Sequence, residues 1–243
     1  MKQKKSELTP IIKTRLHVEI IEQLKDKIIR GDLQPGSKLP PERELADQLK
    51  VNRTTVREAL HKLESMGLIE IKHGNGIFVK DFLESGSLDL AGQILFLDGK
   101  LNIKILKNML DLRRLLVPEI SYYAALNRNA KDLSELERII FQSHDMLIEE
   151  KDWRVHNIIA RSSGNLLFVI LLNSFTGLTR DSSQLYFAVE ENRMRSRKFH
   201  GEIYEAIKRE DALKAKEIML EVLLFAEEQT LKALGIEIER NKK

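Results

Sequence analysis

The sequence contains no cysteine among its 243 residues. This absence excludes disulfides and thiolate chemistry, and it fits a reducing compartment such as the cytoplasm. Long apolar runs are missing as well, and without a run of about 18 apolar residues no transmembrane helix is predicted. The N-terminal residues are charged and lack the apolar core and small-residue cleavage site of a secretory leader. These absences predict a cytoplasmic protein with no membrane partner.

The composition is that of a globular protein whose charge is unevenly distributed. Hydrophobic residues make up 42% of the chain and charged residues 32%, which excludes a disordered protein. Residues 1–80 hold 16 Lys and Arg against 11 Asp and Glu, or +5, whereas the remainder holds 24 against 26, or −2. A basic first third is expected if only that part meets a polyanion such as DNA. Ordinary surface charge explains the same numbers equally well.

The first eighty residues read as three helices followed by a hairpin. Asn52 is a favoured N-cap residue, and the helix that follows it ends at Gly67, a favoured C-terminal stop. The dipeptide Asn75-Gly76 favours a tight hairpin turn between two short alternating runs. The pattern predicts helices over residues 14–30, 40–49 and 53–66, and strands over residues 68–71 and 77–79.

The rest of the chain reads as helical throughout. No strand-like alternation interrupts the helical spacing of apolar residues between about residues 101 and 234. The candidate helices span residues 102–127, 131–149, 151–163, 165–189, 191–209 and 211–234. We therefore predict a mainly α protein with a basic tail (1–12), a first domain (13–80), a linker with a short helix (81–100), an all-helical domain (101–235) and a C-terminal tail (236–243).

The helix after Asn52 carries a polar edge in its first turns and an apolar face opposite. A recognition helix presents its N-terminal residues to base edges in the major groove. Arginine pairs bidentately with guanine, and threonine binds phosphates or contacts a thymine methyl. A capped surface helix with ordinary side chains would show the same pattern, so this helix alone leaves DNA binding open. The residues of the polar edge are Arg53, Thr54, Thr55 and Arg57.

The run LPPERELADQLKVNRTTVREALHKLESMGLIEIKHGNGIFV resembles the winged-helix signature of the GntR family of bacterial regulators. The resemblance covers about residues 14–80 and implies a winged helix-turn-helix, with three helices and a β-hairpin wing, that binds DNA. Arg43 resembles the family's phosphate- and base-contacting arginine at the start of the second helix. His73 and Gly74 fall on the wing tip, which contacts the minor groove or the backbone. The recognition-helix contacts of the family fall on Arg53, Thr54, Thr55 and Arg57.

The same resemblance implies partners. Members of the family bind palindromes as dimers, because two-fold symmetry in the protein matches two-fold symmetry in the operator. We therefore expect a homodimer on double-stranded, palindromic operator DNA, acting as a regulator of bacterial metabolism. The sequence does not itself indicate the dimer interface.

The helical half resembles the FCD domain of the FadR subfamily over about residues 100–233. The segments LKNMLDLRRLLVPEISYYAA, DWRVHNIIARSSGN and RKFHGEIYEAIKREDALKAKEIM carry this resemblance. It implies an all-α helical bundle that binds a small-molecule effector. In many members an Asp and three His hold a divalent metal. Asp152, His156 and His200 match three of these ligands, and Val222 stands where the fourth belongs.

The three matching residues have two interpretations. Asp152 and His156 are four residues apart, so both project from one helix face, and with His200 they form a recognised set for Zn, Ni or Mn. Alternatively, Asp152 and His156 form a helix-stabilising pair and His200 is a hydrogen-bonded core residue. The missing ligand at Val222 is expected to weaken any metal site.

The effector is predicted by the resemblance together with two further residues. Arg113 matches a family arginine that points into the effector cavity and binds a carboxylate bidentately, although a solvent-facing arginine is the alternative. Asn165 is either a polar ligand contact or the N-cap of the next helix. We expect a small organic acid held by metal and Arg113. The alternative is acyl-CoA without metal, because VKDFLESGSLDL and GNLLFVILLNSFTGL resemble the fatty-acid regulator that names the subfamily.

Catalysis is the remote alternative. An Asp and His metal site with open positions can activate water, as in a metal-dependent hydrolase fused to a DNA-binding domain. The sequence shows no supporting nucleophile, Gly-rich phosphate loop or second carboxylate cluster. A structural DNA-packaging protein would show weak sequence preference and no ligand pocket. We therefore predict a regulator that is not an enzyme.

Overall fold

The structure, a computed structural model, describes residues 16–97 and 100–236, without the side chains of residues 88, 89, 93, 96, 97 and 175–185. The chain divides into two compact units, and the boundary lies between Asn102 and Ile103. The predicted tail 1–12 and residues 237–243 of the predicted C-terminal tail lie outside the described residues.

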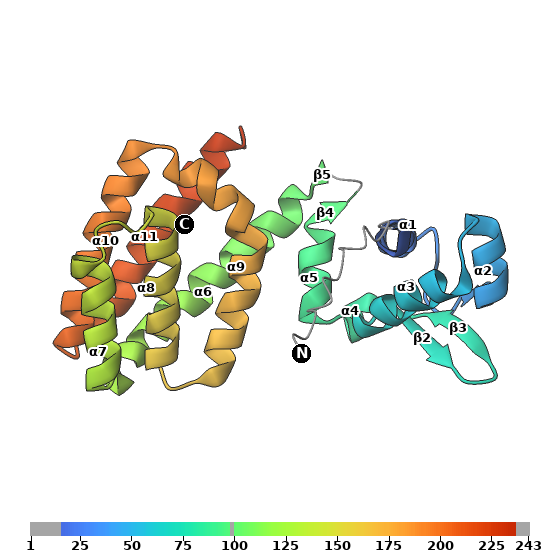
Figure 1. Cartoon of the computed structure of the whole chain (residues 1–243), viewed down its shortest axis with the longest axis horizontal. Coiled ribbons are helices and arrows are strands. Elements are labelled where there is room, and N and C mark those ends of the chain that lie inside the picture. Colours follow the sequence, from blue (N-terminus) through green and yellow to red (C-terminus); the bar gives the residue numbers. More distant parts are fainter. Residues whose placement is uncertain (1–15, 98–99, 237–243) are drawn as a thin grey trace, which may run out of the picture. The chain divides into compact units, whose positions relative to one another are not determined.

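The first unit contains the predicted three helices and wing (Figure 1). The helices are α1 (Leu16–Arg30), α2 (Glu42–Leu49) and α3 (Arg53–Ser65), and the wing pairs β2 (Ile69–Lys72) with β3 (Gly76–Val79). A third strand, β1 (Lys38–Leu39), pairs with the other edge of β3, so the antiparallel order is β1-β3-β2. The sequence did not predict β1, because two residues are too short to show an alternating pattern.

The apolar face of α3 anchors the first unit. Val56, Leu60 and Leu63 are completely buried, and α3 packs against the buried Ile20 and Ile28 of α1. Because these residues recur every three or four positions, their burial leaves the opposite edge of α3 facing outwards. The predicted anchoring face of the recognition helix is therefore confirmed.

Residues 81–100, predicted as a linker, pack onto the first unit. They form α4 (Phe82–Ser85), α5 (Leu88–Ile94) and the start of a small hairpin between β4 (Phe96–Leu97) and β5 (Lys100–Leu101). Leu90 is buried in the same apolar core as α1 and α3. The Ser85 hydroxyl donates to the carbonyl of Gly67 (2.7 Å), which attaches α4 to the end of α3.

The second unit is all helical within the residues that the structure describes, as predicted (Figure 1). None of its described helices, nor any in the first unit, has the length and apolarity that crossing a bilayer requires. Its helices are α6 (Ile103–Asn127), α7 (Ala130–Glu137), α8 (Ile148–Ser162), α9 (Leu166–Phe187), α10 (Glu190–Lys208) and α11 (Ala212–Ala233), with a π-helical turn at Arg138–Gln142.

One predicted helix, residues 131–149, is wrong. It ends in the π-helical turn at Gln142, and a new helix begins at Ile148 instead of residue 151. The Ser143 hydroxyl donates to the carbonyl of Arg138 (3.1 Å), a local side-chain bond that competes with helical pairing. Apolar residues such as Ile139 and Ile140 continue the helical spacing up to the break. The sequence pattern therefore did not indicate where the helix ends.

The core of the second unit joins α6, α8, α10 and α11. Its apolar part includes Ile120, Ile159, Phe199 and Met219, one from each of these helices and each at most 1% exposed. Polar side chains are buried beside it, above all on α10. A buried polar side chain needs hydrogen-bond partners, so the buried polar residues of α10 form a candidate site.

Candidate functional site

The seven predicted DNA contacts all lie on the first unit, and six of them are exposed. Arg53 and Thr54 begin α3 on its outward edge, and Arg43 lies in the first turn of α2. His73 and Gly74 form the tip of the wing, where Gly74 has a φ of +76° and open space around it. An exposed glycine at this tip lets a partner's backbone approach closely.

Arg57 is held in place by the preceding helix. Its Nη2 lies 2.8 Å from Oε2 of Glu42, and its Nε donates to the same carboxylate at 3.2 Å. The hydrogen bond from Arg57 lowers the pKa of Glu42, so the pair is charged at neutral pH. Glu42 therefore directs one arginine of the recognition helix, an interaction that the sequence did not predict because the partners are fifteen positions apart.

Thr55 is the one half-buried member of the predicted set. Oδ1 of Asn52 accepts hydrogen bonds from the backbone N–H of Thr55 (2.8 Å) and from its hydroxyl (2.9 Å). Asn52 is thus the N-cap, as predicted. Because the Thr55 hydroxyl proton points at the cap, only its lone pairs and methyl group remain for DNA.

A polar cluster lies between α8 and α10 in the second unit. Oδ1 of Asp152 accepts a hydrogen bond from the Ser196 hydroxyl (2.7 Å) and lies 3.0 Å from Nε2 of His200. Oδ2 of Asp152 lies 3.8 Å from Nε2 of His156. The structure therefore brings the three predicted residues together and adds Ser196. The sequence analysis missed Ser196. Its position four residues before His200, on the same face of α10, is the feature of the sequence that indicates it.

Electrostatics fix the charge states in this cluster. Burial would raise the pKa of Asp152, but the hydrogen bond and charge of His200, the charge of His156 and the Ser196 hydroxyl together hold it well below its ordinary value. Burial lowers the pKa of His156 to about 4, with Arg113 and His200 acting in the same direction. At neutral pH Asp152 is ionised and His156 is neutral. An ionised carboxylate only accepts, so Nε2 of His200 carries the shared proton.

The candidate metal ligands do not fit a metal ion as they lie. Among the described residues, no three His, Asp or Glu side chains are arranged to hold one ion. Nε2 of His200 directs a proton towards Asp152, whereas a metal needs its lone pair. Val222, the residue at the fourth position, is buried in the apolar core and offers no ligand. As they lie, these residues form a hydrogen-bonded cluster around Asp152 and not a metal site.

Arg113 and Arg114 are neighbours on α6 with opposite surroundings. Arg114 forms ion pairs with Asp111 (2.5 Å) and Glu227 (3.2 Å). Arg113 makes no hydrogen bond or ion pair with any residue that the structure describes, and its main charged neighbour is Asp152. Burial lowers the pKa of Arg113. Because Arg113 is half-buried and has no hydrogen-bonded anion among the described residues, it is a candidate anion-binding group.

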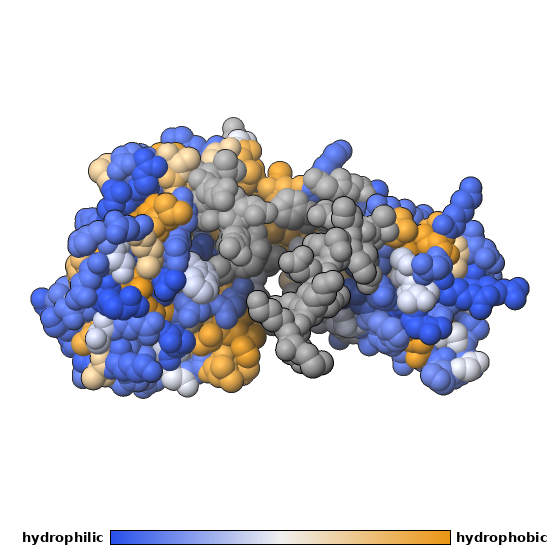
Figure 2. Space-filling model, viewed as in Figure 1, coloured by the Kyte–Doolittle hydropathy of each residue, from blue (hydrophilic) through white to orange (hydrophobic). Residues whose placement is uncertain are grey.

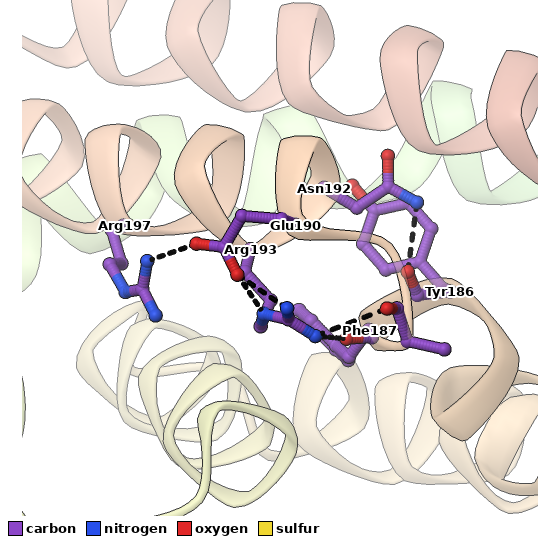
Figure 3. A network of polar contacts seen from close by, with 7 residues as sticks. Tyr186, Phe187, Glu190, Asn192, Arg193 and Arg197 are labelled. Atoms are coloured by element: carbon purple, nitrogen blue, oxygen red, sulfur yellow. Dashed lines mark hydrogen bonds and ion pairs between the residues drawn. The ribbon is translucent and has the colours of Figure 1, made fainter.

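A second polar network holds the junction between α9 and α10 (Figure 3). Nη1 of Arg193 donates to the carbonyl of Phe187 (2.6 Å), and Nδ2 of Asn192 donates to the carbonyl of Tyr186 (2.8 Å). Glu190 pairs with both Arg193 and Arg197. Burial raises the pKa of Tyr186 to about 12, so its hydroxyl stays protonated beside Asp152 and Arg113.

Asn165 lies in a different place from Arg113. Its Oδ1 accepts from the backbone N–H of Leu167 (3.0 Å) in the turn before α9. It lines an open pocket with Tyr123, Asn127 and Phe168, and this pocket does not include Arg113 or the Asp152 cluster. The structure therefore places Asn165 directly before α9, at a pocket whose lining does not include Arg113 or the Asp152 cluster.

Comparisons with known proteins agree with this architecture. Residues 16–79 match the family model "Bacterial regulatory proteins, gntR family", and residues 108–225 match the FCD domain. The regulator Mce2R of Mycobacterium tuberculosis is 32% identical over 173 residues, covering 69% of this chain and 72% of that protein. A fatty acid metabolism regulator protein of Shewanella oneidensis is 35% identical over 171 residues, covering 70% and 71%.

The solved structure of Lar of Listeria monocytogenes has the same fold. It covers 94% of this chain and 100% of its own, with a TM-score of 0.50 and 18% sequence identity. The winged first unit, the helical second unit and the sequence relatives lead to one conclusion. The chain belongs to the GntR family, in its FadR subfamily, as a DNA-binding transcription regulator with an FCD effector domain.

Proposed function

We propose that this regulator changes its affinity for operator DNA when a carboxylic acid binds beside Arg113. The observation that carries the proposal is a contrast between two neighbours. Arg113 is half-buried and has no hydrogen bond or ion pair with any residue that the structure describes, whereas Arg114 forms two ion pairs. A buried charge is costly until it is paired, and the planar fork of arginine matches a carboxylate. The effector supplies the missing anion.

The relatives favour an acid from fatty acid metabolism, since several of them are named fatty acid metabolism regulators. An acyl-CoA is the second candidate, because its phosphates are anions that Arg113 also binds. The metal-assisted site that the sequence predicted gains no support from the Asp152 cluster. Metal analysis of protein purified without chelator decides that point separately. We propose no catalytic role.

We further propose a homodimer on a palindromic operator in the cytoplasm, with the seven named residues of the first unit as DNA contacts. Exposed apolar residues that follow one face of α6 and the start of α9 support a dimer, since apolar patches mark interfaces. Figure 2 shows part of this apolar surface over the N-terminal end of α9. We define the apolar stripe as Leu112, Leu115, Tyr123, Leu126, Leu166, Leu167 and Ile170.

The test of the effector site compares two arginine variants by calorimetric titration with octanoate. We expect Arg113→Gln to weaken octanoate binding by about tenfold or more, because a charge-assisted pair is lost. Arg114→Gln is the matched control and should bind octanoate as the unmodified protein does. Equal binding by all three proteins would refute the proposed site.

Coupling to DNA is tested with the same titration in the presence of operator DNA. Linkage requires that octanoate and DNA change each other's affinity by the same factor. Octanoate affinity that is identical with and without DNA would show that the site does not regulate DNA binding.

A further inference from the structure

The outer strand of the wing has a backbone N–H group that points away from its partner strand. β2 lies at the edge of the sheet, and its one partner strand among the described residues is β3. The N–H of Lys80 donates to the carbonyl of Leu68 (2.9 Å), and the register continues with Ile71 opposite Ile77. Hydrogen-bonded and non-hydrogen-bonded pairs alternate along an antiparallel ladder, so the N–H of Ile71 faces the open edge.

The recognition helix provides the acceptor for this N–H group. Oε1 of Glu64, in the last turn of α3, accepts a hydrogen bond from the N–H of Ile71 (2.9 Å). The other carboxylate oxygen of Glu64 lies 3.6 Å from Nδ1 of His61. A side chain of the recognition helix therefore binds the backbone of the wing directly.

This hydrogen bond lies where the wing leaves the core. Ile69, at the start of β2, is 1% exposed and shares one apolar core with α3, whereas residues 72–75 are all exposed. Ile71 is half-buried and lies between these two parts of the wing. The strands of the wing have only four residues each, and a short hairpin is marginally stable by itself. The direction of the wing tip therefore depends on contacts such as the one between Ile71 and Glu64.

We propose that Glu64 is a positioning residue for DNA binding, which fixes the direction of the wing relative to the recognition helix. Arg53 on α3 and His73 at the wing tip must engage one duplex together, so this inference rests on the proposed DNA contacts. A wing that already has its bound direction loses less conformational freedom when DNA binds. Glu64 acts through the backbone of Ile71 and so strengthens the contact of His73.

The test compares Glu64→Ala with Glu64→Gln in the full chain, on a duplex that the unmodified protein selects from random DNA. Both variants remove the same negative charge, but only glutamine keeps an oxygen that accepts from the N–H of Ile71. We expect Glu64→Ala to bind the duplex about fivefold more weakly than Glu64→Gln, because binding must then supply the order that one hydrogen bond provides. Fluorescence anisotropy of the labelled duplex measures both affinities.

Two further measurements separate positioning from a general loss of stability. Amide hydrogen exchange followed by NMR should be about fivefold faster for Ile71 in Glu64→Ala than in Glu64→Gln. The amide of Val79, which donates to the carbonyl of Ser37 (2.9 Å), is the internal control and should exchange equally in both. Glu64→Ala should also weaken DNA binding little further in a His73→Ala background, because contacts that act through one another are not additive.

The outcomes distinguish this inference from the proposed DNA contacts. Equal DNA affinities of Glu64→Ala and Glu64→Gln, or equal exchange of Ile71 in both, would overturn the role of Glu64. A full additional loss in the His73→Ala background would overturn it too, because the effect would not pass through the wing tip. Undiminished DNA binding by His73→Ala alone would instead overturn the proposed wing contact and this inference with it. Glu64→Ser, whose hydroxyl is too short to reach Ile71, replaces the alanine variant if that variant does not fold.

Discussion

At the scale of single residues, Asn52 determines where the recognition helix begins. Its side chain accepts hydrogen bonds from two donors of Thr55, and the polar edge of α3 starts at the next residue. The N-terminal N–H groups of a helix have no intrahelical partner, so this cap stabilises the turn that presents Arg53 and Thr54.

We predict that Asn52→Ala lowers the free energy of unfolding of the first unit by about 1 kcal/mol, the usual effect of losing an N-cap. Asn52→Ser keeps a capping oxygen and should stay near the unmodified value. The measurement is urea denaturation followed by far-ultraviolet circular dichroism, because the single tryptophan, Trp153, lies in the second unit. Equal losses for both variants would contradict a capping role.

Some site residues could be predicted from the sequence and others could not, and the difference has physical reasons. Asp152 and His156 lie one helical turn apart, so their shared face was visible from spacing alone, whereas the approach of His200 was implied only by family resemblance. Ser196 escaped notice because serine is common on helices and its partner lies 44 positions away. Oδ1 of Asn165 accepts from the N–H of Leu167, the second residue of α9, which is the bond expected of an N-cap, one of its two interpretations.

At the scale of elements, Gly67 joins α3 to the segment that follows the wing. Its φ is +78°, and a Cβ at this position would lie 1.9 Å from the carbonyl oxygen of Ser85. Glycine is common at helix ends, so the sequence predicted the helix stop at Gly67. It did not predict the approach of α4, because the hydrogen bond from Ser85 to Gly67 joins residues eighteen positions apart. The strand β1 and the break before α8 escaped prediction for a related reason, since short or local features leave no periodic pattern.

We predict that Gly67→Ala destabilises the first unit much more than Gly36→Ala. Both glycines have a positive φ, so each substitution incurs a backbone cost of about 1 kcal/mol. Only Gly67 adds a clash with backbone atoms, since nothing lies within 4 Å of a Cβ at Gly36. Thermal unfolding followed by circular dichroism measures the difference, and similar losses for both variants would disprove the close approach of α4.

At the scale of the whole molecule, the proposed homodimer joins two copies of the chain through the apolar stripe. We predict that Leu115→Glu, in the apolar stripe, shifts the protein from dimer to monomer and weakens operator binding, because a buried unpaired carboxylate opposes association. Leu213→Glu is the control, since Leu213 is an equally exposed leucine on α11 outside the stripe. Light scattering after size-exclusion chromatography measures the mass. A monomeric unmodified protein, or a dimeric Leu115→Glu, would reject this interface.

We propose that the outward edge of α3 reads DNA sequence, and selection of binding sites from random duplex DNA tests this proposal. We expect the full chain to enrich an inverted repeat. We expect Arg53→Ala to relax the preference at one position of each half-site, at a cost of about 1–3 kcal/mol. Enrichment of no sequence, or of the same sequence with undiminished preference by Arg53→Ala, would show that Arg53 on α3 does not read DNA sequence.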